Sequence, residues 1–219
     1  GHSLGEYTSL VAAGAISLEE GVKLVHLRGR LMQEAVPIGK GSMAAVLGMD
    51  PAQVRSICEE VSVEGVCEAA NFNSPGQVVI SGETDAIDKA VSMASERGAK
   101  KAVKLKVSAP FHSSLMIPVS SKLREAALSC NWKEPYCPVI ANSTAQPEKK
   151  VDTIIECLVE QTHMPVLWSD SVEYMYHHGV DTFYEIGPGK VLSGLVRKCV
   201  KGSNIHAAGD LKSLENLIK

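Results

Sequence analysis

The first forty residues carry their hydrophobic side chains at helical spacing. Residues 6–13 form one such segment, and a second begins at the S-x-x-E capping box that opens at Ser17 and continues to about residue 35. We therefore expect two helices here. A segment rich in proline and glycine at residues 37–41 ends the pattern and indicates a domain boundary.

Residues 39–108 show a different pattern of short apolar runs that alternate with amphipathic segments. We expect helices at residues 50–61, capped by Asp50, and 84–97, capped by Thr84. The expected strands lie at residues 43–47, 66–70, 77–81 and 102–107. The resulting order, β-α-β-β-α-β, is the split unit of ferredoxin-like folds, so we interpret residues 39–108 as an inserted small domain.

The rest of the chain alternates strands with helices, a pattern typical of an α/β protein with a parallel sheet covered on both faces. The expected strands lie at residues 138–141 and 182–186, with a further short strand and helix near the end of the chain. The expected helices lie at residues 114–130, 152–161, 166–178 and 190–200.

Composition narrows the class of protein. The chain has 219 residues, 45% of them hydrophobic, which suffices for a sizeable core, and it contains neither a long apolar run nor a signal-peptide pattern. Its six cysteines include no C-x-x-C pair, which is typical of reduced thiols, so we expect a cytoplasmic protein. A net charge of −3 argues against nucleic-acid binding, and no His/Cys cluster has metal-ligand spacing.

The pentapeptide GHSLG at residues 1–5 is the leading candidate for catalytic chemistry. In a strand-turn-helix setting, G-x-S-x-G holds a serine on a sharp turn with its hydroxyl exposed, which makes Ser3 the candidate nucleophile. We expect both glycines to be required because the turn leaves no room for a Cβ on either flank. The helix that follows would direct free N–H groups toward a developing oxyanion.

His112 and Arg28 are two further candidate site residues, and each also has a purely structural explanation. His112 stands where an expected strand gives way to a helix, a usual place for sites in α/β proteins, although a helix-capping role is equally compatible. Arg28 precedes Gly29 within a helix. The glycine suggests close packing, and the arginine could bind a carboxylate or could simply be exposed.

Six motifs, in order along the chain, together resemble the malonyl-CoA:acyl carrier protein transacylase family. They are GHSLGE at residues 1–6, RG at 28–29, MQEAVP at 32–37, NFNSPGQ at 71–77, APFH at 109–112 and EIGPGKVL at 185–192. The resemblance implies an α/β-hydrolase-like parallel-sheet core, residues 1–38 and 109–219, that carries a ferredoxin-like subdomain at residues 39–108. It also implies that family strands and a Gln-Gly-rich loop that precede the serine are absent from this chain.

The resemblance further implies a reaction and a set of roles. Ser3 would take the malonyl group from malonyl-CoA as an ester and pass it to the phosphopantetheine thiol of acyl carrier protein, with His112 as general acid and base. The Leu4 N–H would stabilise the oxyanion, and the Gln161 backbone carbonyl would orient His112. The expected substrate-binding residues are Arg28 for the malonyl carboxylate, Phe111 and Asn73. We expect no bound cofactor or metal, coenzyme A thioester as substrate only, no membrane contact, and a monomer.

Three alternatives remain open at this point. A serine hydrolase such as a thioesterase shares the nucleophile and histidine, but it would orient the histidine with a carboxylate and would have no buried arginine. A noncatalytic carrier-protein docking module could keep the fold without the reaction. The chain could also be the acyltransferase domain of a larger polyketide or fatty-acid synthase.

Overall fold

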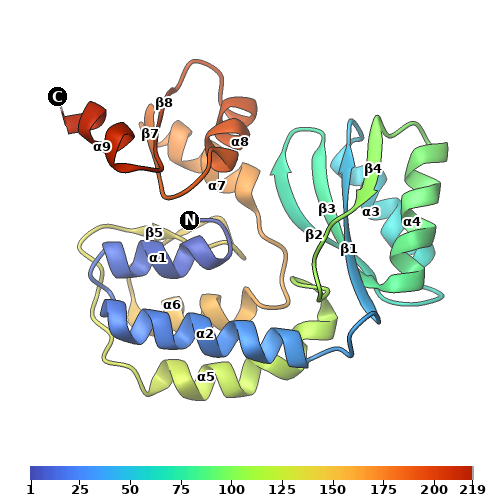
Figure 1. Cartoon of the computed structure of the whole chain (residues 1–219), viewed down its shortest axis with the longest axis horizontal. Helices are drawn as coiled ribbons and strands as arrows, with labels where there is room; N and C mark the ends of the chain where they lie inside the picture. Colours follow the sequence, from blue (N-terminus) through green and yellow to red (C-terminus); the bar gives the residue numbers. More distant parts are fainter. Residues whose placement is uncertain (219) are drawn as a thin grey trace.

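A computed structural model describes residues 1–218 and shows an α/β protein (Figure 1). Its α-helices are α1 (Leu4–Ala12), α2 (Leu18–Glu34), α3 (Pro51–Val61), α4 (Thr84–Glu96), α5 (Ser120–Leu128), α6 (Val151–Glu160), α7 (Trp168–His177), α8 (Val191–Cys199) and α9 (Leu211–Ile218). A 3₁₀ helix, η1, spans Ser114–Val119. The strands are β1 (Gly41–Leu47), β2 (Cys67–Ser74), β3 (Gln77–Glu83), β4 (Lys101–Lys104), β5 (Val139–Ile140), β6 (Pro147–Glu148), β7 (Thr182–Ile186) and β8 (Asn204–Ala208).

Strands β1 to β4 form an antiparallel sheet in the order β2-β3-β1-β4, and with α3 and α4 they make up what we call the four-stranded unit. Both helices pack on one face of the sheet, where side chains such as Ile57, Ile80 and Ile87 form the largest apolar cluster described. The unit lies on the right in Figure 1. Its element order, β-α-β-β-α-β, is the one that the hydrophobic pattern predicts.

Side-chain caps predicted from the sequence are present at two helix starts and absent at a third. Asp50 caps α3 through a capping box with Gln53, and Ser17 caps α2 by accepting the N–H of Glu20, as predicted. The predicted capping role of Thr84 is wrong. Glu83 is the residue that precedes α4, and the Thr84 hydroxyl instead donates to the Gly39 carbonyl, joining α4 to the loop before β1.

Two other segments differ from the sequence prediction. Strand β2 extends to Ser74, so most of residues 71–76, which separate two expected strands, is strand because it pairs with β3. Phe72 also donates its N–H to the Val166 carbonyl on the other side. The helix predicted over residues 114–130 is divided into η1 and α5. Pro118 lies at this division, and proline has no N–H to continue an α-helical ladder.

The remaining helices form the layer that carries the site. Helices α1, α2, α5 and α6 lie together beneath the β7-β8 pair in Figure 1, and an apolar cluster that includes Leu10, Leu24 and Leu158 lies between them. A second cluster around Met32 and Met116 joins α2 to η1. These contacts bring the start of α1, the middle of α2 and the end of α6 together.

The parallel sheet predicted for this part is only partly present in residues 1–218. Strands β7 and β8 pair in parallel, whereas β5 and β6 form a separate antiparallel pair of two-residue strands. Proline residues begin or precede both short strands, and proline cannot donate to a sheet ladder, which limits their pairing. Within the described residues, no helix is both long and apolar enough to cross a membrane.

Candidate active site

The turn before α1 holds Ser3 in a strained backbone conformation. Ser3 has φ 50° and ψ −104°, a region that non-glycine residues rarely adopt, and it immediately precedes the first helical residue, Leu4. A Cβ on Gly1 would lie 1.9 Å from the Gly5 carbonyl oxygen, so this glycine is required. The same expectation for Gly5 is wrong, since a Cβ there would meet no atom of the described residues within 4 Å.

A chain of hydrogen bonds links Ser3, His112 and Gln161. Ser3 Oγ lies 2.9 Å from His112 Nε2, and His112 Nδ1 lies 2.7 Å from the backbone carbonyl oxygen of Gln161. Because a carbonyl oxygen only accepts, Nδ1 carries the proton and Nε2 directs its lone pair at the serine hydroxyl. This is the tautomer that a general base toward Ser3 requires.

His112 occupies a second strained and buried position. Its backbone has φ 58°, its N–H donates to the Thr162 carbonyl, and its side chain is 5% exposed, which does not fit an exposed helix cap. Burial lowers the pKa of His112 from 6.5 to about 3, with a further contribution from the charge on Arg28. The imidazole is therefore neutral, and able to accept a proton, at neutral pH.

Arg28 projects from α2 into the same centre. Its Nη2 donates to Ser3 Oγ at 2.9 Å and to Gln161 Oε1 at 3.0 Å, and the side chain is 7% exposed. Its Nε is buried and has no hydrogen-bond partner among residues 1–218. The guanidinium thus retains an unused donor beside the serine. Close packing at Gly29 is not found, because a Cβ there would meet nothing within 4 Å among the same residues.

The sequence analysis missed two polar residues that are hydrogen-bonded to the serine turn or to its neighbours, Asn142 and Glu6. Asn142 accepts the Ser3 N–H through Oδ1 at 2.6 Å and donates through Nδ2 to the Gly1 carbonyl at 2.8 Å. Glu6, 2% exposed, accepts from Gln161 Nε2 at 2.7 Å and from the Asn142 N–H at 3.0 Å. The available signals were a charged residue on the apolar face of the first helix and a polar residue two positions after the strand β5.

We call these interlinked side chains the polar centre. Its members are Ser3, Glu6, Arg28, His112, Asn142 and Gln161. They come from α1 and the turn before it, α2, the segment before η1, the loop after β5 and the end of α6. The fold thus assembles the centre from five separate parts of the chain.

The remaining predicted site residues lie around this centre. Leu4 is the first residue of α1, and N–H groups in the first turn of a helix have no acceptor within it. Asn73 Oδ1 lies 2.8 Å from His2 Nε2. Phe111, next to His112, packs in apolar clusters that include Met32 and Met43 rather than in any pocket described here.

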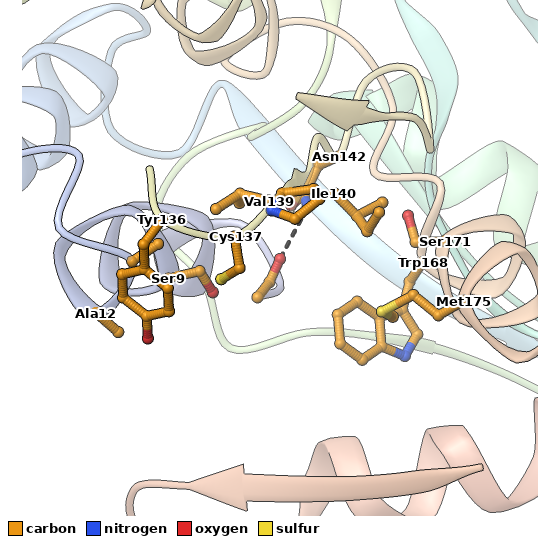
Figure 2. A pocket seen from close by; sticks show the side chains of 13 residues that line it. Ser9, Ala12, Tyr136, Cys137, Val139, Ile140, Asn142, Trp168, Ser171 and Met175 are labelled. Carbon is orange, nitrogen blue, oxygen red and sulfur yellow. Dashed lines mark hydrogen bonds between the residues drawn. The ribbon is translucent and has the colours of Figure 1, made fainter. Parts of the chain in front are cut away.

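Two hollows adjoin the serine turn. The larger, about 860 Å³, is lined by His2, Leu4 and Asn73 and extends toward β7 and α8. The smaller, about 280 Å³, is shown in Figure 2, where Asn142 lies between Trp168 on one side and Tyr136 on the other. The described residues contain no cluster of His, Cys, Asp and Glu side chains that could hold a metal ion.

Comparison with known proteins defines the class to which this fold and site belong. The chain belongs to the acyl transferase domain family, whose match covers residues 1–215. It is 46% identical over 220 residues to the malonyl CoA-acyl carrier protein transacylase of Bacillus subtilis, covering 100% of this chain and 69% of that protein. The resemblance inferred from the six motifs is confirmed.

Solved structures agree. The malonyl CoA-acyl carrier protein transacylase of Coxiella burnetii superposes with a TM-score of 0.97 at 39% identity, covering 100% of this chain and 69% of that one. A malonyl-transacylase solved in complex with its type II PKS acyl-carrier protein gives a TM-score of 0.96 at 42% identity, with coverages of 99% and 70%. The chain thus spans somewhat more than two thirds of the length of these relatives.

Proposed function

We propose that this protein transfers the malonyl group from malonyl-CoA to the phosphopantetheine thiol of an acyl carrier protein and so supplies fatty acid synthesis. The observation that carries the proposal is the buried Arg28, with its unpartnered Nε, beside a hydrogen-bonded Ser3–His112 pair. A transferase for an acyl group with a free carboxylate needs such a cation, and a hydrolase for neutral acyl groups does not. The names of the relatives support the same function.

In the first half-reaction, Ser3 Oγ attacks the thioester carbonyl carbon while its proton passes to His112 Nε2. The C–S bond of the tetrahedral intermediate then breaks, and His112 returns the proton to the departing sulfur, releasing coenzyme A and leaving a malonyl-Ser3 ester. The contact between Ser3 Oγ and Nε2 at 2.9 Å allows this transfer without rearrangement. The Gln161 carbonyl stabilises the imidazolium through Nδ1.

In the second half-reaction, the carrier thiol takes the place of coenzyme A. The thiol gives its proton to His112, its sulfur attacks the ester carbonyl, and Ser3 leaves and recovers the proton. Both intermediates bear an oxyanion, which we assign to the Leu4 N–H at the start of α1, aided by the positive end of the helix dipole. No cofactor is needed for either step.

Substrate selection depends on groups around the serine. Arg28 would pair with the malonyl carboxylate through its planar fork of donors, a geometry that lysine cannot reproduce. Asn73, which is linked to His2 and lines the larger hollow with it, would contact the thioester arm. Phe111 would act by packing beside His112 and narrowing the space for a branched acyl group.

We also propose a domain organisation and a cellular compartment for the protein. The antiparallel order β2-β3-β1-β4 supports a ferredoxin-like subdomain at residues 39–108, inserted into an α/β-hydrolase-like core of residues 1–38 and 109–219. All six cysteines are free thiols, three of them buried, which favours the cytoplasm.

The serine-hydrolase alternative predicts that a carboxylate side chain accepts the hydrogen bond from His112 Nδ1. It also predicts that no arginine is buried beside the serine. The structure has a backbone carbonyl at that position and a 7% exposed Arg28, so both features favour the transferase.

Substitution of Arg28 tests the proposal. Removing the guanidinium in Arg28→Ala leaves the malonyl carboxylate unpaired, so kcat/KM for malonyl-CoA should fall by an amount equivalent to roughly 2–5 kcal/mol. Reaction with acetyl-CoA, which has no carboxylate, should change little, and Arg28→Lys should recover only part of the loss. The measurement is kcat/KM for both thioesters in the complete protein. Equal losses for the two would restrict Arg28 to a structural role.

A further inference from the structure

Glu6 is a buried carboxylate for which the proposed reaction has no use. It lies on the inner face of α1 with Tyr7 and Leu10, and burial raises its pKa to about 7. Placing an ionisable group in such surroundings is unfavourable unless its hydrogen bonds are made, and it forms no ion pair within residues 1–218. The hydrogen bonds that the Glu6 carboxylate accepts should therefore explain its presence at this buried position.

One contact fixes the orientation of the Gln161 side chain. Gln161 Nε2 donates to Glu6 Oε2 at 2.7 Å and to the Ser3 carbonyl at 3.0 Å, while Gln161 Oε1 accepts from Arg28 Nη2 at 3.0 Å. Turning the amide over would direct its oxygen at two acceptors and its NH₂ at a cation. Glu6 thus opposes the flip that would take the acceptor away from Arg28.

The other contact holds the support of the serine turn. The Asn142 N–H donates to the same Glu6 oxygen at 3.0 Å, and the Asn142 side chain binds Ser3 N–H and the Gly1 carbonyl. A single carboxylate oxygen therefore joins the residue that orients Arg28 to the residue that braces the strained Ser3 backbone. The segments that it joins are far apart in the sequence, since Gln161 is 155 residues from Glu6.

We propose that Glu6 is a positioning residue that sets acyl-group selection by fixing the Gln161 amide and, through it, the direction of the Arg28 guanidinium. The inference rests on the proposed malonyl transfer. Its essential element is an acceptor oxygen at a fixed distance, and the negative charge is secondary. Glu6 does not touch the reacting atoms, so its effect should be seen in the preference for malonyl over acetyl groups.

Three substitutions separate acceptor position from charge. Glu6→Gln keeps the length and one acceptor oxygen without the charge, Glu6→Asp keeps the charge but withdraws the acceptor by one methylene, and Glu6→Leu removes the acceptor at similar volume. Each is assayed in the complete protein for kcat/KM with malonyl-CoA and acetyl-CoA. Glu68→Gln is the matched control, because Glu68 also accepts a backbone N–H, that of Ser114, but does not contact Gln161 or Arg28.

We expect the malonyl-to-acetyl ratio to stay within about threefold of wild type in Glu6→Gln and in the control, and to fall about tenfold or more in Glu6→Asp and Glu6→Leu, since small misplacements of a binding group can change rates by up to about 10². If Glu6→Leu does not fold, the other two variants still test the proposal, because the malonyl-to-acetyl ratio should be higher in Glu6→Gln than in Glu6→Asp. A ratio preserved in Glu6→Asp, or lower in Glu6→Gln than in Glu6→Asp, would overturn the proposal. A wild-type protein without malonyl preference would instead contradict the proposed function.

Discussion

The four-stranded unit and the polar centre are built on opposite principles. In the unit, the positions buried between the sheet and its two helices are apolar, with Ile80 and Ile87 essentially inaccessible there. In the polar centre, buried positions are charged or polar, and Ser3 and His112 have positive φ. The first arrangement stabilises the fold through burial of apolar surface, whereas the second costs stability because it holds polar groups and a strained backbone in place. Substitutions in the four-stranded unit should therefore lower the free energy of unfolding, whereas substitutions in the polar centre should lower the rate of the reaction.

The largest effect is expected at His112. Without its imidazole, Ser3 has no base, so His112→Ala should slow both half-reactions by about 10²–10⁴, the usual range for a positioned acid and base. Rates of malonyl-Ser3 formation and of its transfer to carrier protein, measured separately, test this. Turnover at the wild-type rate would remove His112 from the reaction.

A comparable change in the four-stranded unit should act on stability instead. Ile80→Ala opens a cavity between β3 and the two helices and should lower the free energy of unfolding by about 2–5 kcal/mol. Below the unfolding transition, kcat/KM should remain near wild type. Denaturant titration and assays on the same preparation provide both quantities. A large loss of kcat/KM without loss of stability would contradict the division between the two regions.

His112 should make the free energy of unfolding depend on pH. Its pKa is about 3 when folded and 6.5 ordinarily, so between these values the unfolded chain binds a proton that the folded chain excludes. This contribution to stability is complete above pH 6.5 and diminishes as the pH falls, by about 2 kcal/mol between pH 6.5 and 5.

Glu6 contributes in the opposite direction. Its raised pKa of about 7 means that the folded chain holds the extra proton between pH 4.5 and 7. Unfolding curves of wild type and His112→Gln at several pH values isolate the histidine, because Glu6 is common to both. A difference between the two proteins that does not change with pH would contradict the assignment of a buried, neutral imidazole.

The smallest effect on stability is expected from removing the buried cation of the polar centre. Arg28→Met removes a buried, desolvated cation but also leaves Gln161 Oε1 without its donor. These two effects oppose each other, so the free energy of unfolding should change by no more than about 1 kcal/mol while malonyl transfer is lost. Thermal and chemical unfolding measure the first quantity and kcat/KM the second. A loss of stability above about 2 kcal/mol would show that Arg28 supports the fold.

The sequence located several elements through local patterns, although it misassigned the cap of α4 to Thr84. Helical spacing and the Ser17 and Asp50 caps located α2 and α3, and alternating apolar runs located β1 and β3. The combined motifs led to Ser3, His112, Arg28 and Gln161, which the fold brings together.

Features that depend on distant partners could not be predicted in this way. The hydrogen bond from Phe72 to the Val166 carbonyl is one such feature. The contacts of Glu6 with Asn142 and Gln161 are another, since all of these partners are remote in the chain. Neither spacing nor propensity carries information about such partners. The same is true of Gly5, where only the folded structure shows that a Cβ would meet nothing nearby among the described residues.

The central claim is that Ser3 carries the malonyl group. Brief incubation of the complete protein with malonyl-CoA, followed by intact-mass measurement, should show a single malonyl adduct that is lost on adding carrier protein with its phosphopantetheine thiol. The adduct should be absent in Ser3→Ala and present in a control such as Ser9→Ala, whose hydroxyl merely donates to the Gly5 carbonyl on α1. A malonyl adduct that persists in Ser3→Ala would contradict the account.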